Sequence, residues 1–260
     1  MPIPRNRSTR RCLVLVLALL CSAMVRADEL IRTVRELKPA VVGIGSLRRL
    51  ATPPLQFIGS GFVVGNGLQI ITSAHIIEDL RKTVQDQEIG ILVRRDEEAE
   101  FRLAHVDAMD ARHDLALLSV KGTALPAVQL GDSASVEEGR SLAFMGFPLA
   151  MALGLRHVTH RCTVAALTPI AMPAAVAGRL QPRAAQQLAR QAYTLFQLDG
   201  TAYPGNSGGP LFDPDTGVVF GIINMVFVRG SRESAISQPS GITYAIPSQY
   251  IRALLAQPAH

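Results

Sequence analysis

The chain carries the run Pro204-Gly205-Asn206-Ser207-Gly208-Gly209-Pro210-Leu211, in which a serine stands between closely spaced glycines. Glycines at this density indicate a backbone turned too tightly for side chains. Such a turn can aim the backbone N–H groups of Gly205 and Ser207 at one point beside the Ser207 hydroxyl. Two converging donors beside a hydroxyl form an oxyanion hole for acyl transfer. An ordinary hairpin is the competing interpretation, because Asn, Gly, Ser and Pro are all turn formers.

Residues 1–27 have the composition of a secretory signal peptide. Arginines precede the apolar run Cys12–Val25, and Val25-Arg26-Ala27 offers small residues for cleavage after Ala27. A transmembrane anchor is the alternative, but the apolar run is short for a span. The rest of a 260-residue chain that is 48% apolar and 18% charged is long and apolar enough to bury a core. We therefore expect an exported globular protein, periplasmic or secreted.

Charge and cysteine content bear on the kind of partner and on the cellular compartment. Removing the five arginines of residues 1–27 leaves 21 basic against 21 acidic residues, so the high isoelectric point belongs to the leader. A nucleic-acid partner then loses its electrostatic basis, and we expect no membrane contact after cleavage. Cys162 is alone once Cys12 and Cys21 leave, so no internal disulfide forms. An exported chain without bridges fits a bacterial periplasm.

Short β-branched runs separated by Gly, Asn, Asp and Pro follow from residue 41 onward and predict an all-β barrel or sandwich. Roughly 220 residues suit two barrels, which we divide into residues 28–130 and 131–260. Helical spacing predicts helices at Asp28–Lys38 and Ser248–Gln257, and a helical insertion at Pro173–Ala192. The expected strands are Val41–Ile44, Gly61–Gly65, Gln69–Thr72, Ile89–Arg94, Leu115–Val120, Ser141–Met145, His157–Leu167, Tyr193–Leu198, Val218–Val228 and Gly241–Ile246.

Ser207 needs a base, because a hydroxyl is a poor nucleophile until its proton is removed. His75 is the best candidate, since the apolar strand Gln69–Thr72 runs into a small-residue turn that holds its ring. Taken alone, it could equally be a structural histidine. Asp114 stands at the mouth of an apolar strand, where a partly desolvated carboxylate needs a partner. It could instead cap a turn, but the order His, Asp, Ser is that of chymotrypsin.

These segments resemble a known family, the chymotrypsin-fold serine proteases of the HtrA/Deg type, from about Val41 to Leu255. The matching blocks are Gly59-Ser60-Gly61-Phe62-Val63, Thr72-Ser73-Ala74-His75, Asp114-Leu115-Ala116-Leu117-Leu118, Leu130-Gly131-Asp132-Ser133, Gly205-Asn206-Ser207-Gly208-Gly209-Pro210-Leu211 and Tyr244-Ala245-Ile246-Pro247-Ser248. The resemblance implies two six-stranded β-barrels with the site between them, and no cofactor. It implies His75 as general base, Asp114 as its orienter and Ser207 as nucleophile. The Gly205-Asn206-Ser207 loop would form the oxyanion hole.

The sequence departs from the family pattern in three places. The family usually carries PDZ domains after the protease, whereas this chain ends soon after the last shared block, so we expect no PDZ domain within it. The insertion Pro173–Ala192 exceeds the usual loop. Asn206 replaces the Asp that pairs with a freed N-terminus in digestive enzymes, so we expect no activation by N-terminal clipping. The sequence leaves open whether the protein forms a homo-oligomer.

The same resemblance extends to the pocket for the substrate residue before the cleaved bond, called P1. Thr201, six residues before the serine, would form a small neutral floor, with Ala202 lining the pocket. Val226 and Phe227 would form an apolar opposite wall. We expect cleavage after small or medium aliphatic residues.

A metal site is the weaker reading of His157, His160 and Cys162, although these residue types bind zinc. In a strand, position 157 faces away from 160 and 162 because faces alternate, so we expect no metal. The leading hypothesis is therefore a cofactor-free serine endopeptidase acting on unfolded proteins or peptides. The alternative is a catalytically silent peptide binder or holdase of the same fold.

Overall fold

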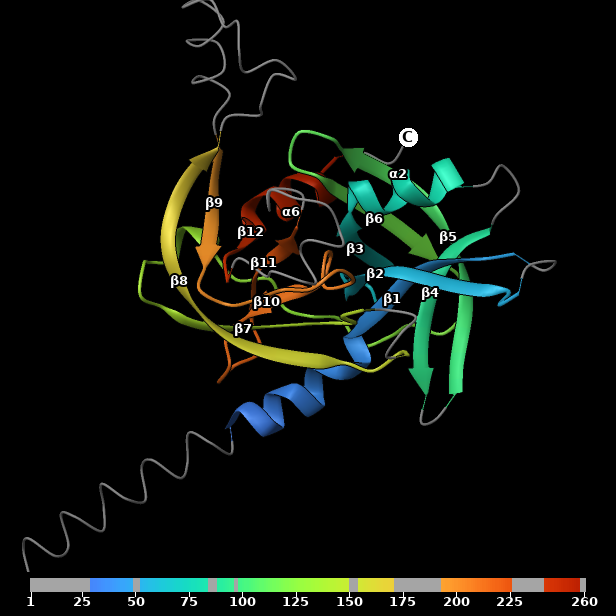
Figure 1. Ribbon diagram of the computed structural model, residues 1–260, viewed down its shortest axis with the longest axis horizontal. Helices are drawn as coiled ribbons and strands as arrows, with labels where there is room; N and C mark the ends of the chain where they lie inside the picture. The colour runs from blue at the N-terminus through green and yellow to red at the C-terminus, as the bar shows by residue number, and fades with distance from the viewer. Residues whose placement is uncertain are drawn as a thin grey trace, which may run out of the picture.

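The computed structural model describes residues 29–48, 52–83, 88–95, 98–149, 154–170, 193–225 and 241–257. Twelve strands within these ranges form two closed barrels, with strand orders β1-β2-β3-β6-β5-β4 and β10-β11-β12-β9-β8-β7. All named strand pairs are antiparallel. Figure 1 shows the barrels side by side, the first on the right and the second on the left. The prediction of an all-β, two-barrel fold is confirmed.

The first barrel contains strands β1 to β6 and one helix, α2. The bounds are η1 (Lys38–Ala40), β1 (Val41–Leu47), β2 (Leu55–Val64), β3 (Gln69–Ser73), α2 (Ala74–Thr83), β4 (Glu88–Arg95), β5 (Glu98–Asp110) and β6 (Leu115–Val120). Before them, residues 29–37 form the expected N-terminal helix. The sequence did not predict α2 or β5.

The second barrel contains strands β7 to β12 and ends in helix α6. The bounds are η2 (Ser133–Ser135), β7 (Ser141–Gly146), β8 (Val158–Ile170), β9 (Tyr193–Leu198), β10 (Pro210–Phe212), β11 (Val219–Asn224), β12 (Thr243–Pro247) and α6 (Ser248–Leu255). The three-residue strand β10 was not predicted. The predicted signal peptide at 1–27 and the helical insertion at 173–192 lie outside the described residues, as do positions 226–228.

Strands β1, β2 and β3 have two largely buried faces. On β1, β2 and β3, one face joins a core cluster confined to the first barrel, which includes Val42, Val63 and Ile70. The other face, with Phe62 and Ile71, joins a cluster that also contains residues of the second barrel. Burial on both faces requires these strands to be nearly continuously apolar, and it holds the barrels against each other.

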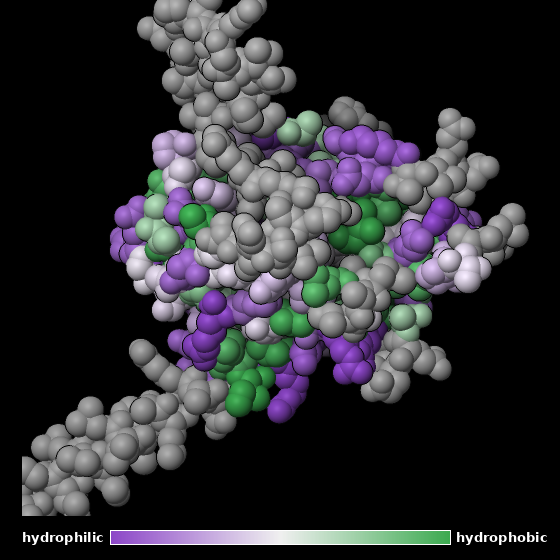
Figure 2. All heavy atoms as spheres, in the orientation of Figure 1, coloured by the Kyte–Doolittle hydropathy of each residue, from purple (hydrophilic) through white to green (hydrophobic). Residues whose placement is uncertain are grey.

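The helix formed by residues 29–37 borders a groove of about 590 Å³ against β8. Its lining is both apolar and basic: Leu30, Ile31, Val34, Arg35, Lys38, Thr159 and Arg161. Figure 2 shows hydrophobic residues gathered at the lower edge of the molecule, where Figure 1 places this helix. Among the described residues, none forms a helix long and apolar enough to cross a membrane.

Candidate active site

Asp114 caps the helix that carries His75. The backbone N–H of Ala74 donates to the Asp114 carbonyl at 3.1 Å, and the N–H of His75 donates to Asp114 Oδ1 at 2.7 Å. The first N–H groups of a helix lack partners within it, and negative charge is favoured at that end. The cap comes from a distant part of the chain, which is why sequence reasoning expected only a turn at His75 and missed helix α2.

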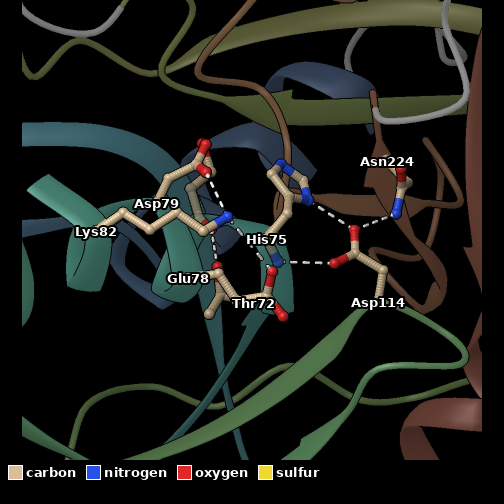
Figure 3. Close-up of polar contacts among 8 residues, drawn as sticks. Thr72, His75, Glu78, Asp79, Lys82, Asp114 and Asn224 are labelled. Carbon is tan, nitrogen blue, oxygen red and sulfur yellow. Dashed lines mark hydrogen bonds and ion pairs between the residues drawn. The ribbon is translucent and has the colours of Figure 1, made fainter.

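The same carboxylate holds the His75 ring. Nδ1 of His75 lies 2.6 Å from Asp114 Oδ2 (Figure 3). An ionised carboxylate can only accept, so Nδ1 carries the hydrogen of this bond. In the neutral ring Nε2 is then free of hydrogen and can accept a proton. This is the tautomer that a general base needs.

A second donor reaches Asp114 from the other barrel. Asn224 closes strand β11, is fully buried, and donates Nδ2–H to Asp114 Oδ2 at 2.6 Å. Figure 3 shows the carboxylate lying between His75 and Asn224. Sequence reasoning missed Asn224. The available signal was a polar residue at the end of an apolar run.

The turn that carries Asp114 is held by aromatic packing. Asp114 itself has φ +52°, in the left-handed region that non-glycine residues rarely adopt. His113 lies 2.6 Å from Asp110 through Nδ1 and Oδ2, and its ring stacks on Tyr250 of α6 at 4.1 Å between centroids. Tyr193 of β9 meets the same ring edge-on at 4.8 Å. Burial, followed by the charge of Asp114, raises the pKa of Tyr193 to about 12, so its hydroxyl stays neutral.

Ser207 lies on a loop bound to the same strand end. It is only 5% exposed, and the N–H of the next residue, Gly208, donates to the Ile223 carbonyl at 2.9 Å. Ile223 directly precedes Asn224, whose side chain binds Asp114. The serine loop is therefore tied to the strand end that contacts the Asp114 carboxylate.

The loop offers two unused amide donors. The N–H of Asn206 donates to the Tyr203 carbonyl at 2.9 Å, and Gly205 has φ +101°. Within the described ranges, the N–H groups of Gly205 and Ser207 donate to no protein acceptor. The buried amide side chain of Asn206 also lacks a hydrogen-bond partner there. The two free N–H groups are those expected for an oxyanion hole.

Thr201 and Ala202 lie on the segment that precedes the serine loop. The N–H of Ala202 donates to Thr243 Oγ1 at 2.9 Å, and that hydroxyl donates to the Gly200 carbonyl at 2.6 Å. Thr243 of β12 thus positions the predicted pocket floor, a role the sequence did not reveal. Val226 and Phe227 lie outside the described residues.

The residues of the alternative metal site have other contacts. His157 Nε2 lies 2.9 Å from the Val41 carbonyl, and the His160 ring stacks on Phe144 at 4.7 Å. Burial raises the pKa of the Cys162 thiol to about 12. The described part of the chain contains no cluster of three or more metal-binding side chains.

Two six-stranded barrels with a histidine–aspartate pair and a glycine-flanked serine at their junction define the chymotrypsin-like class of proteins. A family model described as "Trypsin-like peptidase domain" matches residues 59–222, and the chain belongs to that family. Within it, the chain is of the HtrA type, a class of serine proteases.

Two curated relatives are both named "Probable periplasmic serine endoprotease DegP-like". The Halomonas elongata protein is 31% identical over 191 residues, covering 73% of this chain and 32% of its own length. The Pseudomonas putida protein is 32% identical over 193 residues, covering 74% and 33%. The chain thus spans about a third of the length of these relatives.

Solved structures share the fold. The crystal structure of Deg5 superposes with a TM-score of 0.62 at 22% identity, covering 87% of this chain and 92% of its own. An HtrA-type protease, AlgW, solved with a tripeptide, gives a TM-score of 0.60 at 22% identity, covering 87% and 62%.

Proposed function

We propose that this chain is a serine endopeptidase in which His75, Asp114 and Ser207 form the catalytic triad. One observation carries the proposal. The Asp114 carboxylate binds both the backbone and the ring of His75 at 2.7 and 2.6 Å, and binds Asn224 at the strand end that holds the serine loop. A carboxylate used in this way fixes the tautomer and orientation of an imidazole that must accept a proton.

The chemistry follows from these positions. Ser207 Oγ attacks the peptide carbonyl while His75 Nε2 takes its proton, and Asp114 stabilises the imidazolium that forms. The N–H groups of Gly205 and Ser207, with Asn206 between them, bind the oxyanion of the tetrahedral intermediate. His75 then gives the proton to the leaving amine, and the C–N bond breaks to leave an acyl-enzyme. Water, deprotonated by His75, hydrolyses the ester and restores Ser207. No cofactor is needed.

The substrate class rests on the pocket and on the relatives. Thr201 and Ala202 offer no charge to bind a Lys or Arg at P1, and Val226 and Phe227 add apolar character. We propose cleavage after small or medium aliphatic residues of unfolded proteins. Peptides with Ala, Val, Leu, Lys or Glu at P1 test this, and faster cleavage after Lys would contradict it.

The relatives' names and the composition of residues 1–27 support export to the periplasm, or secretion, after cleavage of a signal peptide. The balanced charge of the remaining chain supports protein or peptide partners rather than nucleic acid or membrane. The division into barrels at 28–130 and 131–260 is part of the same proposal.

Labelling with an active-site-directed fluorophosphonate tests the central claim. We expect the wild type to be labelled and Ser207→Ala and His75→Ala not to be, while Ser135→Ala, an exposed serine, labels normally. Absence of labelling in folded wild type, with retained binding of unfolded casein, would instead support the silent peptide binder or holdase.

A further inference from the structure

Ser60 makes four hydrogen bonds at the junction of the two barrels. It lies on β2 and is fully buried. Its N–H donates to the Ser207 carbonyl at 2.8 Å, and its carbonyl accepts from Thr72 Oγ1 at 2.7 Å. Its hydroxyl donates to the Gly205 carbonyl at 2.6 Å and accepts from the Phe147 N–H at 3.0 Å. Backbone and side chain of Ser60 therefore both hold the serine loop.

The direction of the hydroxyl hydrogen is fixed by its neighbours. The Phe147 amide can only donate, so Ser60 Oγ must accept there. A hydroxyl has a single hydrogen, which is then available for the Gly205 carbonyl, an obligate acceptor. The bond to Gly205 is thus the one that depends on the hydroxyl as a donor.

The Gly205 carbonyl belongs to a turn whose type depends on the direction of the Pro204–Gly205 peptide. The Asn206 N–H closes it onto the Tyr203 carbonyl, with Pro204 second and Gly205 third at φ +101°. These features fit a type II turn, whereas a type I turn has the third residue near φ −90°. The two forms differ by rotation of the Pro204–Gly205 peptide, which reverses the direction of the Gly205 N–H.

Two bonds hold the turn in the observed form. The Leu149 N–H donates to the Pro204 carbonyl at 2.7 Å, and the Ser60 hydroxyl donates to the Gly205 carbonyl. Because a peptide group is planar, the Leu149 bond to the Pro204 carbonyl fixes the direction of the Gly205 N–H, which belongs to the same peptide and points away from Leu149. The Ser60 bond holds the next peptide, so it anchors the Gly205 Cα from the other side and keeps this N–H in place rather than setting its direction.

We propose that Ser60 is a positioning residue for the oxyanion hole: its hydroxyl holds the Gly205 carbonyl and so keeps Gly205, with its free N–H, at the place where the reacting carbonyl oxygen binds. This inference rests on the proposed function. Ser60 touches no substrate. Its effect appears only where charge develops in the transition state, because the oxyanion hole binds that state more strongly than the substrate.

Ser60→Ala and the nearly isosteric Ser60→Cys, whose thiol is a weak donor, test the inference. Removing one oxyanion donor outright costs about 100- to 1,000-fold in kcat, so loosening one predicts roughly a 10- to 100-fold loss. We expect that loss in kcat for Ser60→Ala, a smaller loss for Ser60→Cys, and KM within about threefold of wild type. Inhibition by a peptide aldehyde, which forms an oxyanion, should weaken in parallel, while inhibition by the corresponding peptide alcohol, which forms none, should not.

Ser119→Ala is the matched control. Its hydroxyl also donates a partly buried hydrogen bond in the first barrel, to Asp107 Oδ1 at 2.8 Å. It should keep wild-type kcat. Unchanged kcat in folded Ser60→Ala, or equal weakening of aldehyde and alcohol inhibition, overturns the inference while the proposed function stands. Inactive wild type overturns both. If both Ser60 variants unfold, as judged by circular dichroism, Ser60 is a general structural residue and the proposal fails.

Discussion

At the scale of single residues, Asp114 connects the elements of the site. Its carbonyl and Oδ1 cap helix α2, and its Oδ2 binds both His75 and Asn224. Such a carboxylate is left with few unused acceptor positions, so these bonds hold it in one orientation. The left-handed backbone at φ +52° fits a residue that its surroundings hold in place.

Asn224→Asp tests whether Asp114 needs the hydrogen bond that the neutral side-chain amide of Asn224 donates to it. The variant places two carboxylates within hydrogen-bond distance, where both cannot be ionised without strong repulsion. We expect kcat/KM at pH 7 to fall roughly 10-fold or more, since an ionised carboxylate at position 224 cannot donate to Asp114 and repels it. Asn66→Asp, which is exposed and retains its acceptor for the Leu68 N–H, is the control. A kcat/KM equal to that of wild type in the folded variant would contradict this role for Asn224.

At the scale of elements, the serine loop is shaped by contacts that leave no room for side chains. A Cβ added to Gly208, at φ +86°, would lie 2.0 Å from the Ser60 carbonyl oxygen and 2.7 Å from Thr72 Oγ1. The loop therefore fits against β2 and β3 only with glycine at this position. Hydrogen bonds to Ile223 hold it from the other barrel.

Gly208→Ala should lower the free energy of unfolding by about 3 kcal/mol or more, because steric clash adds to the strain of a positive φ. Gly122→Ala is the matched control. Gly122 has φ +108° but nothing within 4 Å of an added Cβ, so strain alone should cost roughly 1 kcal/mol. Urea denaturation of both variants measures the difference. Equal losses would mean that the loop moves away from Ser60 without penalty.

The elements that the sequence predicted are those whose signal is local. Strands such as Leu115–Val120 and Tyr193–Leu198 are apolar runs with clear ends, and their observed bounds agree. Helix α2 was missed because its cap is Asp114, distant in sequence. Strand β5 was missed because Glu98–Asp110 is rich in charged residues and alanine, and pairing with β4 and β6 outweighs that low propensity. β10 is too short to give a pattern.

The residues of the candidate site also differ in whether their local sequence predicts them. Ser207, His75 and Asp114 could be predicted because each stands in a distinctive local context. Ser60, Asn224 and Thr243 could not, since each acts through a hydrogen bond to a residue far along the chain. A single sequence contains no record of which distant residues meet.

At the scale of the whole molecule, the two barrels are joined by a shared core and by polar contacts around it. Residues of both barrels form one buried cluster. At its edge, His157, which precedes β8, contacts the Val41 carbonyl of β1 at 2.9 Å and packs on Phe147 at 4.5 Å. His157 also lines a cavity of about 430 Å³ with Lys38, Pro39, Arg94 and Arg156.

The His157 contact makes the junction sensitive to acid. Burial lowers the pKa of this imidazole, Lys38 and Arg94 lower it further, and the Val41 hydrogen bond only partly opposes them. The folded state therefore favours neutral His157, whereas the unfolded chain takes up a proton near pH 6.5. The stability that His157 contributes is present above pH 6.5 and is lost as the pH falls below it.

His157→Gln tests this, because glutamine can donate to the Val41 carbonyl but does not titrate. At pH 7.5 we expect the variant to be less stable than wild type by about 1 kcal/mol, since it loses the ring contact with Phe147. As the pH is lowered from 7 to 5, the unfolded wild-type chain takes up a proton at His157 that the folded state binds less readily. The free energy of unfolding of wild type therefore falls while that of the variant is unaffected at this position, and the gap should narrow. Urea denaturation midpoints at several pH values measure the gap. A gap that stays constant or widens towards pH 5 would show that the junction does not depend on the charge state of His157.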